Sequence, residues 1–388
     1  MKEFLKQNLF LVFIVIFLVF TLLCALVGYS ASSQNYTQKD SISKLPWSMS
    51  PTDQYPVIFS SEVPGQFEVY DEDKVLLIDA EGKVLKELDD PDNDLGEGFH
   101  LFKKDDDYGV RDKDGRIIIE ANYKNIDEFH HGYASAWNGV HHELLDKNGH
   151  KVLSNLLISE ITYIGDGKFF VNAGRHYILD VDTGKEISLP SKIIGITTDG
   201  NDSYMARLSG DTFCYLSKDF TIPRGAVLYG ELPEYSEGLA YAKRYDDLIV
   251  DEKHNIPLTR GHTPACGYMN KNHELVLPLP YKDIQKCSPF SEGKALIYAD
   301  KKVICIDTEG KELFTLEDSN RQDWYESTFS GGYVSLTLDG KKEGIINDKG
   351  EFVIEPLFNF IGRIQGGYAV VNYKDKYGIL DLNQLKSS

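Results

Sequence analysis

Cysteine, tryptophan and methionine are scarce in this 388-residue sequence, with five, three and four copies. The four cysteines beyond residue 30 lie in separate segments without metal-ligand spacing, which excludes a dense disulfide framework and a zinc site of the Cys-x-x-Cys type. Single disulfides stay open, but the fold cannot depend on many of them. These four residues are Cys214, Cys266, Cys287 and Cys305.

The common catalytic signatures are also missing. The sequence has no G-x-S-x-G, P-loop, H-E-x-x-H or G-x-G-x-x-G pattern, so the usual hydrolase, nucleotide, zinc-protease and dinucleotide motifs are absent. Carboxylates are plentiful, but they are spread over turns and no pair is singled out for acid/base chemistry. We therefore predict no catalytic residues and a protein that is not an enzyme.

Basic residues are outnumbered, with 41 Lys and Arg against 60 Asp and Glu, for a net charge of −19. Such a surface repels nucleic acid and anionic lipid, so we expect no nucleic-acid partner. It also keeps a domain outside the cytoplasm soluble. A bound cation or a basic partner is compatible with this charge, although an acidic balance is more often only a solvated surface.

Only one long uncharged run is present, from Leu9 to Gly28, and it follows Lys2 and Lys6. About 20 such residues match the thickness of a bilayer, and the positive charge before them favours a cytoplasmic N-terminus. The predicted order is a cytoplasmic stub (1–8), a transmembrane anchor (9–29), a linker (30–52) and an external domain (53–388). The alternative is a signal segment cleaved near Gly28 or Ser30, which would give a secreted protein.

Helical periodicity is absent after this run, and a repeat takes its place. A turn signal of Asp or Asn followed three residues later by Gly recurs, with weaker copies near Asp180, Ser217, Asn270 and Asp381. The spacing is about 35 residues, a period typical of stacked or radial β units. The clearest copies are Asp79/Gly82, Asp112/Gly115, Asp146/Gly149, Asp307/Gly310 and Asn347/Gly350.

One interval in this series is longer by about 18 residues, which indicates an insertion in the first hairpin loop of one unit, within residues 244–264. Extra residues on a rigid repeat tend to form binding loops, because the scaffold holds them at no cost to its core. A neutral insertion is equally compatible with the pattern. The candidate ligand-binding residues there are Asp246, His254, Arg260 and His262.

Within a unit, alternation of period two indicates four short antiparallel strands. In the clearest unit these are strand A (Tyr133 to Trp137), strand B (Glu143 to Asp146), strand C (Lys151 to Ser154) and strand D (Ile158 to Tyr163). Strands of this length cannot bury enough surface alone, so neighbouring units must pack on one another. The predicted fold class is all-β, built of tandem β-meander repeats.

These residues resemble the bacterial WG-repeat family, whose unit has an aromatic-Gly pair opening strand B, a D-x-x-G turn and an aromatic-Ser-Glu-Gly turn. The resemblance spans roughly 53–388, is strong at 99–154 and 265–382, and fades between 155 and 230. No Trp occupies a Trp-Gly position, and Glu143, Tyr177, Cys214 and Ile304 replace the glycine. The resemblance implies a β-repeat architecture and a surface location, and no shared chemistry. The matching segments are Tyr108-Gly109, Tyr377-Gly378, Ile354-Glu355-Pro356, Tyr235-Ser236-Glu237-Gly238 and Phe290-Ser291-Glu292-Gly293.

The two ends of the repeat domain are expected to share one unit. The chain ends after a strand B (Tyr377 to Leu382), and Tyr55 to Gly65 resembles the strand D and turn of Tyr123 to Gly132. This pairing would close a β-propeller-like ring, and an open β-superhelix is the alternative. Pairing of residues 55–60 only within their own unit would argue against closure.

Two sets of residues are candidates for metal binding. Asp90, Asp92 and Asp94 alternate as in a calcium loop, but Leu101 stands where a bidentate Glu belongs, and a solvated acidic loop is the default interpretation. Four histidines flank strand A and would offer imidazole ligands to a transition metal, with surface histidines as the commoner alternative. They are His130, His131, His141 and His142.

Together these features favour a membrane-anchored binding or scaffold protein with its β-repeat domain outside the cell, recognising protein, peptide or cell-wall polymer. No cofactor is expected apart from the calcium just considered. Two rivals stay open: a hydrolase on a propeller-like frame, which needs convergent carboxylates or histidines in one pocket, and a structural spacer or sensor arm, which needs no concave polar site.

Overall fold

The computed structural model describes residues 42–387, except 62, 72–73, 89–92, 200–202, 211, 250–262, 318–326 and 339. The expected membrane run at 9–29 lies outside these residues. Over the part that is described, no helix is both long and apolar enough to cross a membrane. The described chain is all-β and ends in a 3-10 helix, η2 (Leu382–Ser387).

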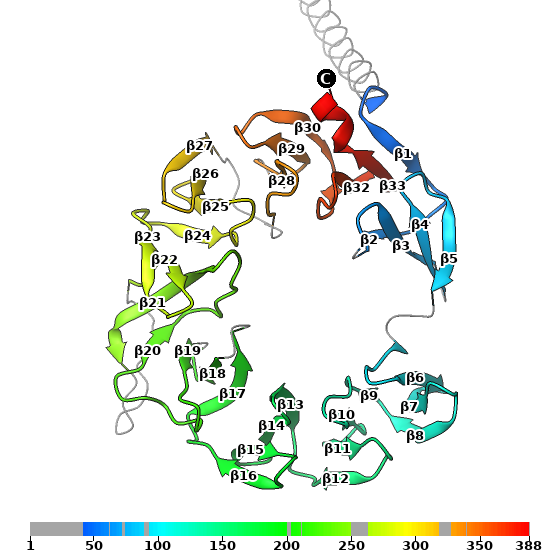
Figure 1. Ribbon diagram of the computed structural model, residues 1–388, viewed down its shortest axis with the longest axis vertical. Helices are drawn as coiled ribbons and strands as arrows, with labels where there is room; N and C mark the ends of the chain where they lie inside the picture. The colour runs from blue at the N-terminus through cyan, green and yellow to red at the C-terminus, as the bar shows by residue number, and fades with distance from the viewer. Residues whose placement is uncertain are drawn as a thin grey trace, which may run out of the picture.

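The strands form small antiparallel sheets arranged around a ring (Figure 1). We number the units along the chain. Unit 1 contains β2 (Ile58–Ser60), β3 (Gln66–Asp71), β4 (Lys74–Asp79) and β5 (Val84–Leu88), and unit 2 contains β6 (Phe99–Lys104), β7 (Asp107–Asp112) and β8 (Ile117–Tyr123). Unit 3 contains β9 (Asn125–Ile126), β10 (Tyr133–Trp137), β11 (His142–Asp146) and β12 (Lys151–Ser154). Unit 4 contains β13 (Glu160–Gly165), β14 (Lys168–Asn172), β15 (His176–Asp180) and β16 (Lys185–Ser188).

Units 5 and 6 share one sheet because the long strand β21 pairs with β20 as well as with β22. Unit 5 contains β17 (Ile193–Thr198), β18 (Tyr204–Leu208), β19 (Thr212–Tyr215) and β20 (Val227–Tyr229), and unit 6 contains β21 (Leu239–Ile249), β22 (Ala265–Asn270) and β23 (Leu275–Pro278). Unit 7 contains β24 (Ile284–Cys287), β25 (Lys294–Ala299), β26 (Lys302–Asp307) and β27 (Glu312–Glu317). Unit 8 contains β28 (Tyr333–Leu336), β29 (Glu343–Asn347) and β30 (Phe352–Phe358).

The last unit joins both ends of the chain. Unit 9 contains β31 (Phe360–Ile361), β32 (Tyr368–Tyr373) and β33 (Lys376–Asp381), and its fourth strand is β1 (Trp47–Thr52), which pairs with β33. The two ends of the described chain therefore share a unit, as expected, although the test stated for closure, pairing of residues 55–60 outside their own unit, is not met. The segment assigned to this pairing is wrong: β2 pairs only with β3 of its own unit, and the strand that joins the ends lies inside the expected linker 30–52.

The predicted strands A, B and C match β10, β11 and β12 to within one residue, but strand D belongs to the next sheet. The segment predicted from Ile158 to Tyr163 forms β13, which pairs with β14 of unit 4. The reason is local: the two-residue turn Asp166-Gly167 follows β13, so that strand folds back onto β14, the strand A after it. The sheets of units 1, 3, 4 and 7 therefore combine a short inner strand D with the following A, B and C, whereas the sheets of units 2 and 8 have three strands without a strand D (Figure 1).

The D-x-x-G turns close the hairpins between strands B and C, as predicted. In unit 7 the Asp307 side chain accepts hydrogen bonds from the backbone N–H of Glu309 at 3.0 Å and of Lys311 at 2.9 Å. Gly310 has a φ of +82°, a conformation that glycine adopts without steric cost. Aspartate and glycine thus each have a separate role in the turn, which explains their fixed spacing.

Neighbouring units cover each other's apolar faces. Every hydrophobic cluster among the described residues contains side chains of at least two neighbouring units; one, for example, combines Phe67 and Ile78 of unit 1 with Val370 and Ile379 of unit 9. This confirms that no unit supplies a core by itself. None of these clusters joins unit 1 to unit 2, so, in the described part, that junction is the one place around the ring without a shared core.

The aromatic-Gly pair marks a close approach of strand C to strand B. A Cβ added to Gly109 would lie 2.6 Å from the carbonyl oxygen of Ile119, and one added to Gly344 would lie 2.6 Å from that of Ile354. Both positions adjoin an irregularity in the pairing of strands B and C. Only glycine fits where a backbone comes this close.

Candidate functional site

The turn between strand D and strand A has the same backbone in several units. Two consecutive residues adopt positive φ, with values of 52° and 82° at Glu237 and Gly238 and of 54° and 70° at Glu292 and Gly293. This is the signature of a type I′ turn, the two-residue connection that matches the twist of a hairpin. The glutamate tolerates an uncommon conformation, which calls for a compensating interaction.

That interaction links each unit to the next. The Glu292 carboxylate accepts hydrogen bonds from the backbone N–H of Gly331 at 2.5 Å and of Gly332 at 2.8 Å, in the equivalent turn of unit 8. The Glu237 carboxylate accepts one in the same way from Gly293 at 2.9 Å. The glutamate of this motif therefore holds successive turns together.

The serine of the motif acts in parallel. The Ser236 hydroxyl donates to the carbonyl oxygen of Phe290 at 2.6 Å, and the Ser291 hydroxyl donates to that of Phe329 at 2.7 Å. Phe290 and Phe329 are themselves buried. Serine and glutamate together fix the inner segments of units 6, 7 and 8 relative to one another.

These inner segments border a cavity of about 550 Å³. Its lining comes from the equivalent stretch of four successive units, the residues that lead into each D–A turn. A volume of this size lies within the range of roughly 300 to 1,000 Å³ that is typical of ligand pockets. The lining residues are Glu234, Tyr235, Ser236, Pro289, Phe290, Ser291, Ser327, Thr328, Ser335, Phe360, Ile361, Gly362, Arg363 and Ile364.

Two smaller hollows adjoin this cavity along the ring. One of about 280 Å³ shares Phe360, Gly362 and Arg363 with it and continues to β2 of unit 1. Another, of about 120 Å³, shares Glu234 and Pro289 with it and lies between units 6 and 7. We call the three together the inner track. It runs from unit 6 to unit 1.

The central cavity of the inner track is suited to binding by shape, hydroxyl groups and aromatic rings. The Ser327 and Ser335 hydroxyls lie 3.2 Å apart, and Tyr235, Phe290 and Phe360 supply aromatic surface. Its described lining residues include no histidine that could act as a general base for a serine. The cavity therefore offers hydroxyl groups and aromatic rings as its main contact groups.

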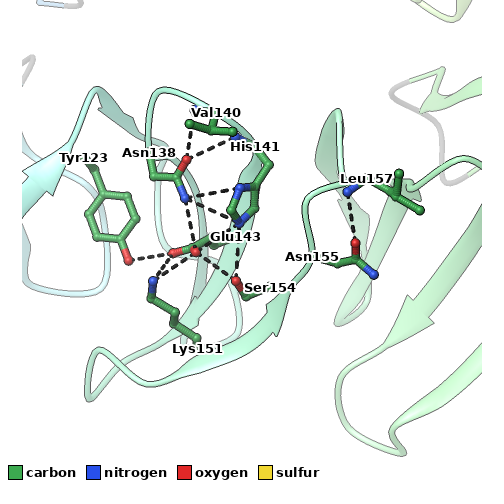
Figure 2. Close-up of polar contacts among 9 residues, drawn as sticks. All are labelled: Tyr123, Asn138, Val140, His141, Glu143, Lys151, Ser154, Asn155 and Leu157. Carbon is green, nitrogen blue, oxygen red and sulfur yellow. Dashed lines mark hydrogen bonds and ion pairs between the residues drawn. The ribbon is translucent and has the colours of Figure 1, made fainter.

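A buried polar cluster is centred on Glu143 of β11 (Figure 2). Its carboxylate accepts hydrogen bonds from Tyr123 at 2.9 Å, Ser154 at 2.8 Å and Lys151 at 2.9 Å. Burial favours a higher pKa for Glu143, but these hydrogen bonds outweigh it and hold the pKa below its ordinary value. A carboxylate so fully engaged is an anchor for its strands, without free capacity for a substrate.

The candidate histidines do not converge on one point. His141 Nε2 lies 3.2 Å from Glu143, His142 Nδ1 lies 3.3 Å from the Ser135 hydroxyl, and the His130 ring stacks on Tyr163 with centroids 4.2 Å apart. Burial lowers the pKa of His142. Across the described ranges, no group of three or more His, Cys, Asp or Glu side chains is placed to hold a metal ion.

Of the three aspartates proposed to bind calcium, only Asp94 lies among the described residues. Asp90 and Asp92 lie outside the described residues, and Asp94 accepts a hydrogen bond from the backbone N–H of Gly96 at 2.9 Å. This is the geometry of a local turn. Asp94 belongs to no group of three or more described His, Cys, Asp or Glu side chains that could hold a metal ion.

Of the four candidate ligand-binding residues in the insertion, only Asp246 lies among the described residues. Asp246 lies on β21, is exposed, and forms an ion pair with Arg244 at 2.8 Å; it does not line the inner track. His254, Arg260 and His262 lie outside the described residues. The first residues of the insertion extend β21 so that it pairs with β20, which joins units 5 and 6 into one sheet.

The four cysteines of the repeat domain are free thiols. Burial raises the pKa of Cys214 and of Cys305 to about 12. At that pKa almost no thiolate forms at neutral pH, so these two residues act as small apolar side chains of the core.

Comparisons with known proteins agree with the repeat. The family described as WG containing repeat matches residues 108–136, 267–302 and 344–377, so WG repeats are present in three regions of the chain. These regions lie within the two stretches where the sequence resemblance was strongest. A search of curated proteins found no match.

Solved structures with a related course of the chain are distant. A eukaryotic initiation factor is 11% identical with a TM-score of 0.45, covering 86% of this chain and 93% of its own. BamB from Moraxella catarrhalis is 11% identical with a TM-score of 0.37, covering 85% and 94%. The Pan2 WD40 domain from Neurospora crassa is 10% identical with a TM-score of 0.30, covering 84% and 87%. All these TM-scores are below 0.5, so the architecture rests on the strand order described above.

Sequence reasoning identified the aromatic-Ser-Glu-Gly turn but missed the cavity beside it. The recurrence of that turn in successive units was the available signal, since equivalent segments of neighbouring units must lie side by side in a repeat array. Arg363 carried no signal, because it belongs to no motif of the repeat.

Proposed function

We propose that this protein is a binding scaffold that recognises an extended segment of a protein, a peptide or a peptide-bearing cell-wall polymer in the inner track. It acts without catalysis and without a cofactor. Its repeat domain is held outside the cytoplasm by the N-terminal apolar run, as the charge around Leu9 to Gly28 favours.

The central cavity of about 550 Å³ is the observation that supports this proposal, because four successive units contribute equivalent segments to it. A ligand that lies across several units gains contacts from each, which suits a linear chain better than a compact metabolite. The hydrogen bonds of Ser236, Ser291 and Glu292 hold the lining segments in place before binding. Such preorganisation lowers the entropic cost of association.

Selection from a library of random dodecapeptides displayed on phage, with the purified full chain as bait, tests the proposal. Enriched peptides should bind the wild type, and Thr328→Trp, which fills the cavity, should weaken them at least tenfold. Thr315→Trp on the outer strand β27 is the matched control and should bind as the wild type does. Absence of enrichment, or binding that ignores Thr328→Trp, would overturn the proposal and favour a spacer.

The location is tested separately. A membrane-impermeant amine-reactive biotin should label lysines of the repeat domain, such as the exposed Lys74, in intact cells. Labelling only after lysis would contradict the external placement.

A further inference from the structure

A single arginine lines the junction between two hollows of the inner track. Arg363 borders both the 550 Å³ cavity and the 280 Å³ hollow next to it, and its side chain is exposed. Its backbone carbonyl accepts a hydrogen bond from Ser60, but among the described residues no carboxylate pairs with its guanidinium. The chain has 60 acidic residues, and an arginine that none of the described ones pairs with is available to bind the anionic group of a ligand.

The opposite end of the cavity carries the opposite charge. Glu234 of unit 6 lines the same cavity, is exposed, and has no cationic partner among the described residues. It also borders the 120 Å³ hollow, where Glu231 and Lys286 are the other charged groups. Lys243 and Lys286 lie near Glu231 and offset its charge, so Glu234 is the carboxylate that makes this end of the cavity negative.

The stretch between these ends is uncharged. Units 7 and 8 contribute Pro289, Phe290, Ser291, Ser327, Thr328 and Ser335, which offer hydroxyl groups and aromatic surface. A ligand that fits must place its charges at its two ends and present neutral groups between them.

We propose that the inner track selects a dipolar chain, with a carboxylate bound by Arg363 and an ammonium or guanidinium bound by Glu234. This proposal rests on the proposed function and sets the ligand class and direction within it. The planar guanidinium binds a carboxylate through two parallel hydrogen bonds, which fixes the orientation of that end. Glu234 binds the basic end, so the ligand lies with its acidic group toward unit 9 and its basic group toward unit 6.

The probes are blocked synthetic peptides with one lysine and one glutamate separated by two to five alanines, each made in both orders. One spacing is expected to bind best, because only that length brings both charges to their partners. Acetyl and amide caps remove the terminal charges, so the side chains alone are tested. Binding is measured by fluorescence anisotropy with the full chain.

Arg363→Gln and Glu234→Gln should each weaken the best probe about tenfold. The double variant Arg363→Glu with Glu234→Arg should restore binding to the probe of reversed order. Arg116→Gln, an exposed arginine paired with Asp112 on a turn of unit 2, is the matched control and should have no effect. Circular dichroism and melting temperature confirm that each variant is folded.

Failure of this inference is distinct from failure of the proposed function. If phage-selected peptides bind and are lost in Thr328→Trp, but the Arg363 and Glu234 variants change their affinity less than twofold, the track binds peptides and the dipolar selection is wrong. If no selected peptide depends on Thr328, the proposed function fails first.

Discussion

Gly378 of β33 lies against the backbone of Met49 in β1: a Cβ added to the glycine would be 2.9 Å from the Met49 carbonyl oxygen. The same relationship holds between Gly109 and Ile119 within unit 2, at 2.6 Å. Strand β1 therefore occupies in unit 9 the place that strand C occupies elsewhere. The first strand of the domain completes its last sheet, and the chain ends hold each other.

Gly378→Ala should consequently destabilise the whole domain by about 1 to 3 kcal/mol, the usual cost of overpacking. The added methyl would also press on Pro51 N and the Trp47 ring, each 3.0 Å away. Gly195→Ala in β17 is the matched control, because its Cβ would meet only ordinary contacts, the nearest at 3.5 Å from Arg207. Urea unfolding of both variants measures the difference, and equal stability would show that the closure contact is not tight.

The repeat was readable in the sequence because each unit needs the same turn residues. Asp307 and Gly310 are required by one hairpin, whatever surrounds them, so local chemistry fixes their spacing. The pairing of β1 with the last unit could not be predicted from the sequence. Its partner β33 lies at the far end of the chain. Trp47 to Ser50 alternates apolar and polar residues, but this run is only four residues long, is followed by Pro51 and is marked by no turn signal.

The candidate site was readable only in part, for a related reason. Phe290-Ser291-Glu292-Gly293 was recognised as a turn, but its serine and glutamate bond to the next unit, and no local pattern reports a partner nearly 40 residues away. Arg363 is one exposed arginine among many charged residues. Only the three-dimensional position beside two hollows distinguishes it.

Glu292→Ala removes the acceptor for two backbone N–H groups of the next turn, at Gly331 and Gly332. We expect a loss of about 1 kcal/mol in the free energy of unfolding, since each group is exposed enough to find water. Hydrogen exchange at those two glycine amides should rise together with this loss. Glu309→Ala, in the turn at the other end of the same unit, is the control, because the Glu309 carboxylate accepts no hydrogen bond from another described residue. Unchanged exchange at Gly332 would refute the linking role of Glu292.

Glu143→Gln should destabilise the protein by about 2 kcal/mol at neutral pH, because its amide nitrogen cannot accept the bonds from Lys151 and Tyr123 (Figure 2). The folded-state pKa of Glu143 is lowered, so its ionised form adds stability above the ordinary pKa that is lost as pH falls through the folded pKa. The difference between variant and wild type should therefore shrink in acid. Glu160→Gln, exposed on β13, is the control. A difference that stays constant down to pH 2 would contradict this account.

Glu343 shows the opposite electrostatics. It opens β29 at the aromatic position of the aromatic-Gly pair, and its carboxylate accepts a hydrogen bond from the backbone N–H of Ile361 in unit 9 at 2.6 Å. Burial raises its pKa to about 7, and the bond from Ile361 opposes that shift only in part. Glu343 is thus protonated in the folded protein over a pH range where the unfolded chain has already ionised.

The sign of its contribution follows. Below the unfolded pKa of 4.5 Glu343 is protonated in both states and does not change the free energy of unfolding. As pH rises from 4.5 to about 7 only the unfolded state releases the proton, so the free energy of unfolding falls. Above pH 7 this destabilisation is fully present. Glu343→Gln keeps an acceptor for Ile361 without a charge. It should stabilise the protein by about 1 to 3 kcal/mol at pH 8 and by almost nothing at pH 4. Glu351→Gln, at an exposed position in the next turn, is the matched control variant. Urea unfolding at both pH values measures this pH dependence, and equal stabilisation at pH 4 and pH 8 would show that Glu343 does not titrate with folding.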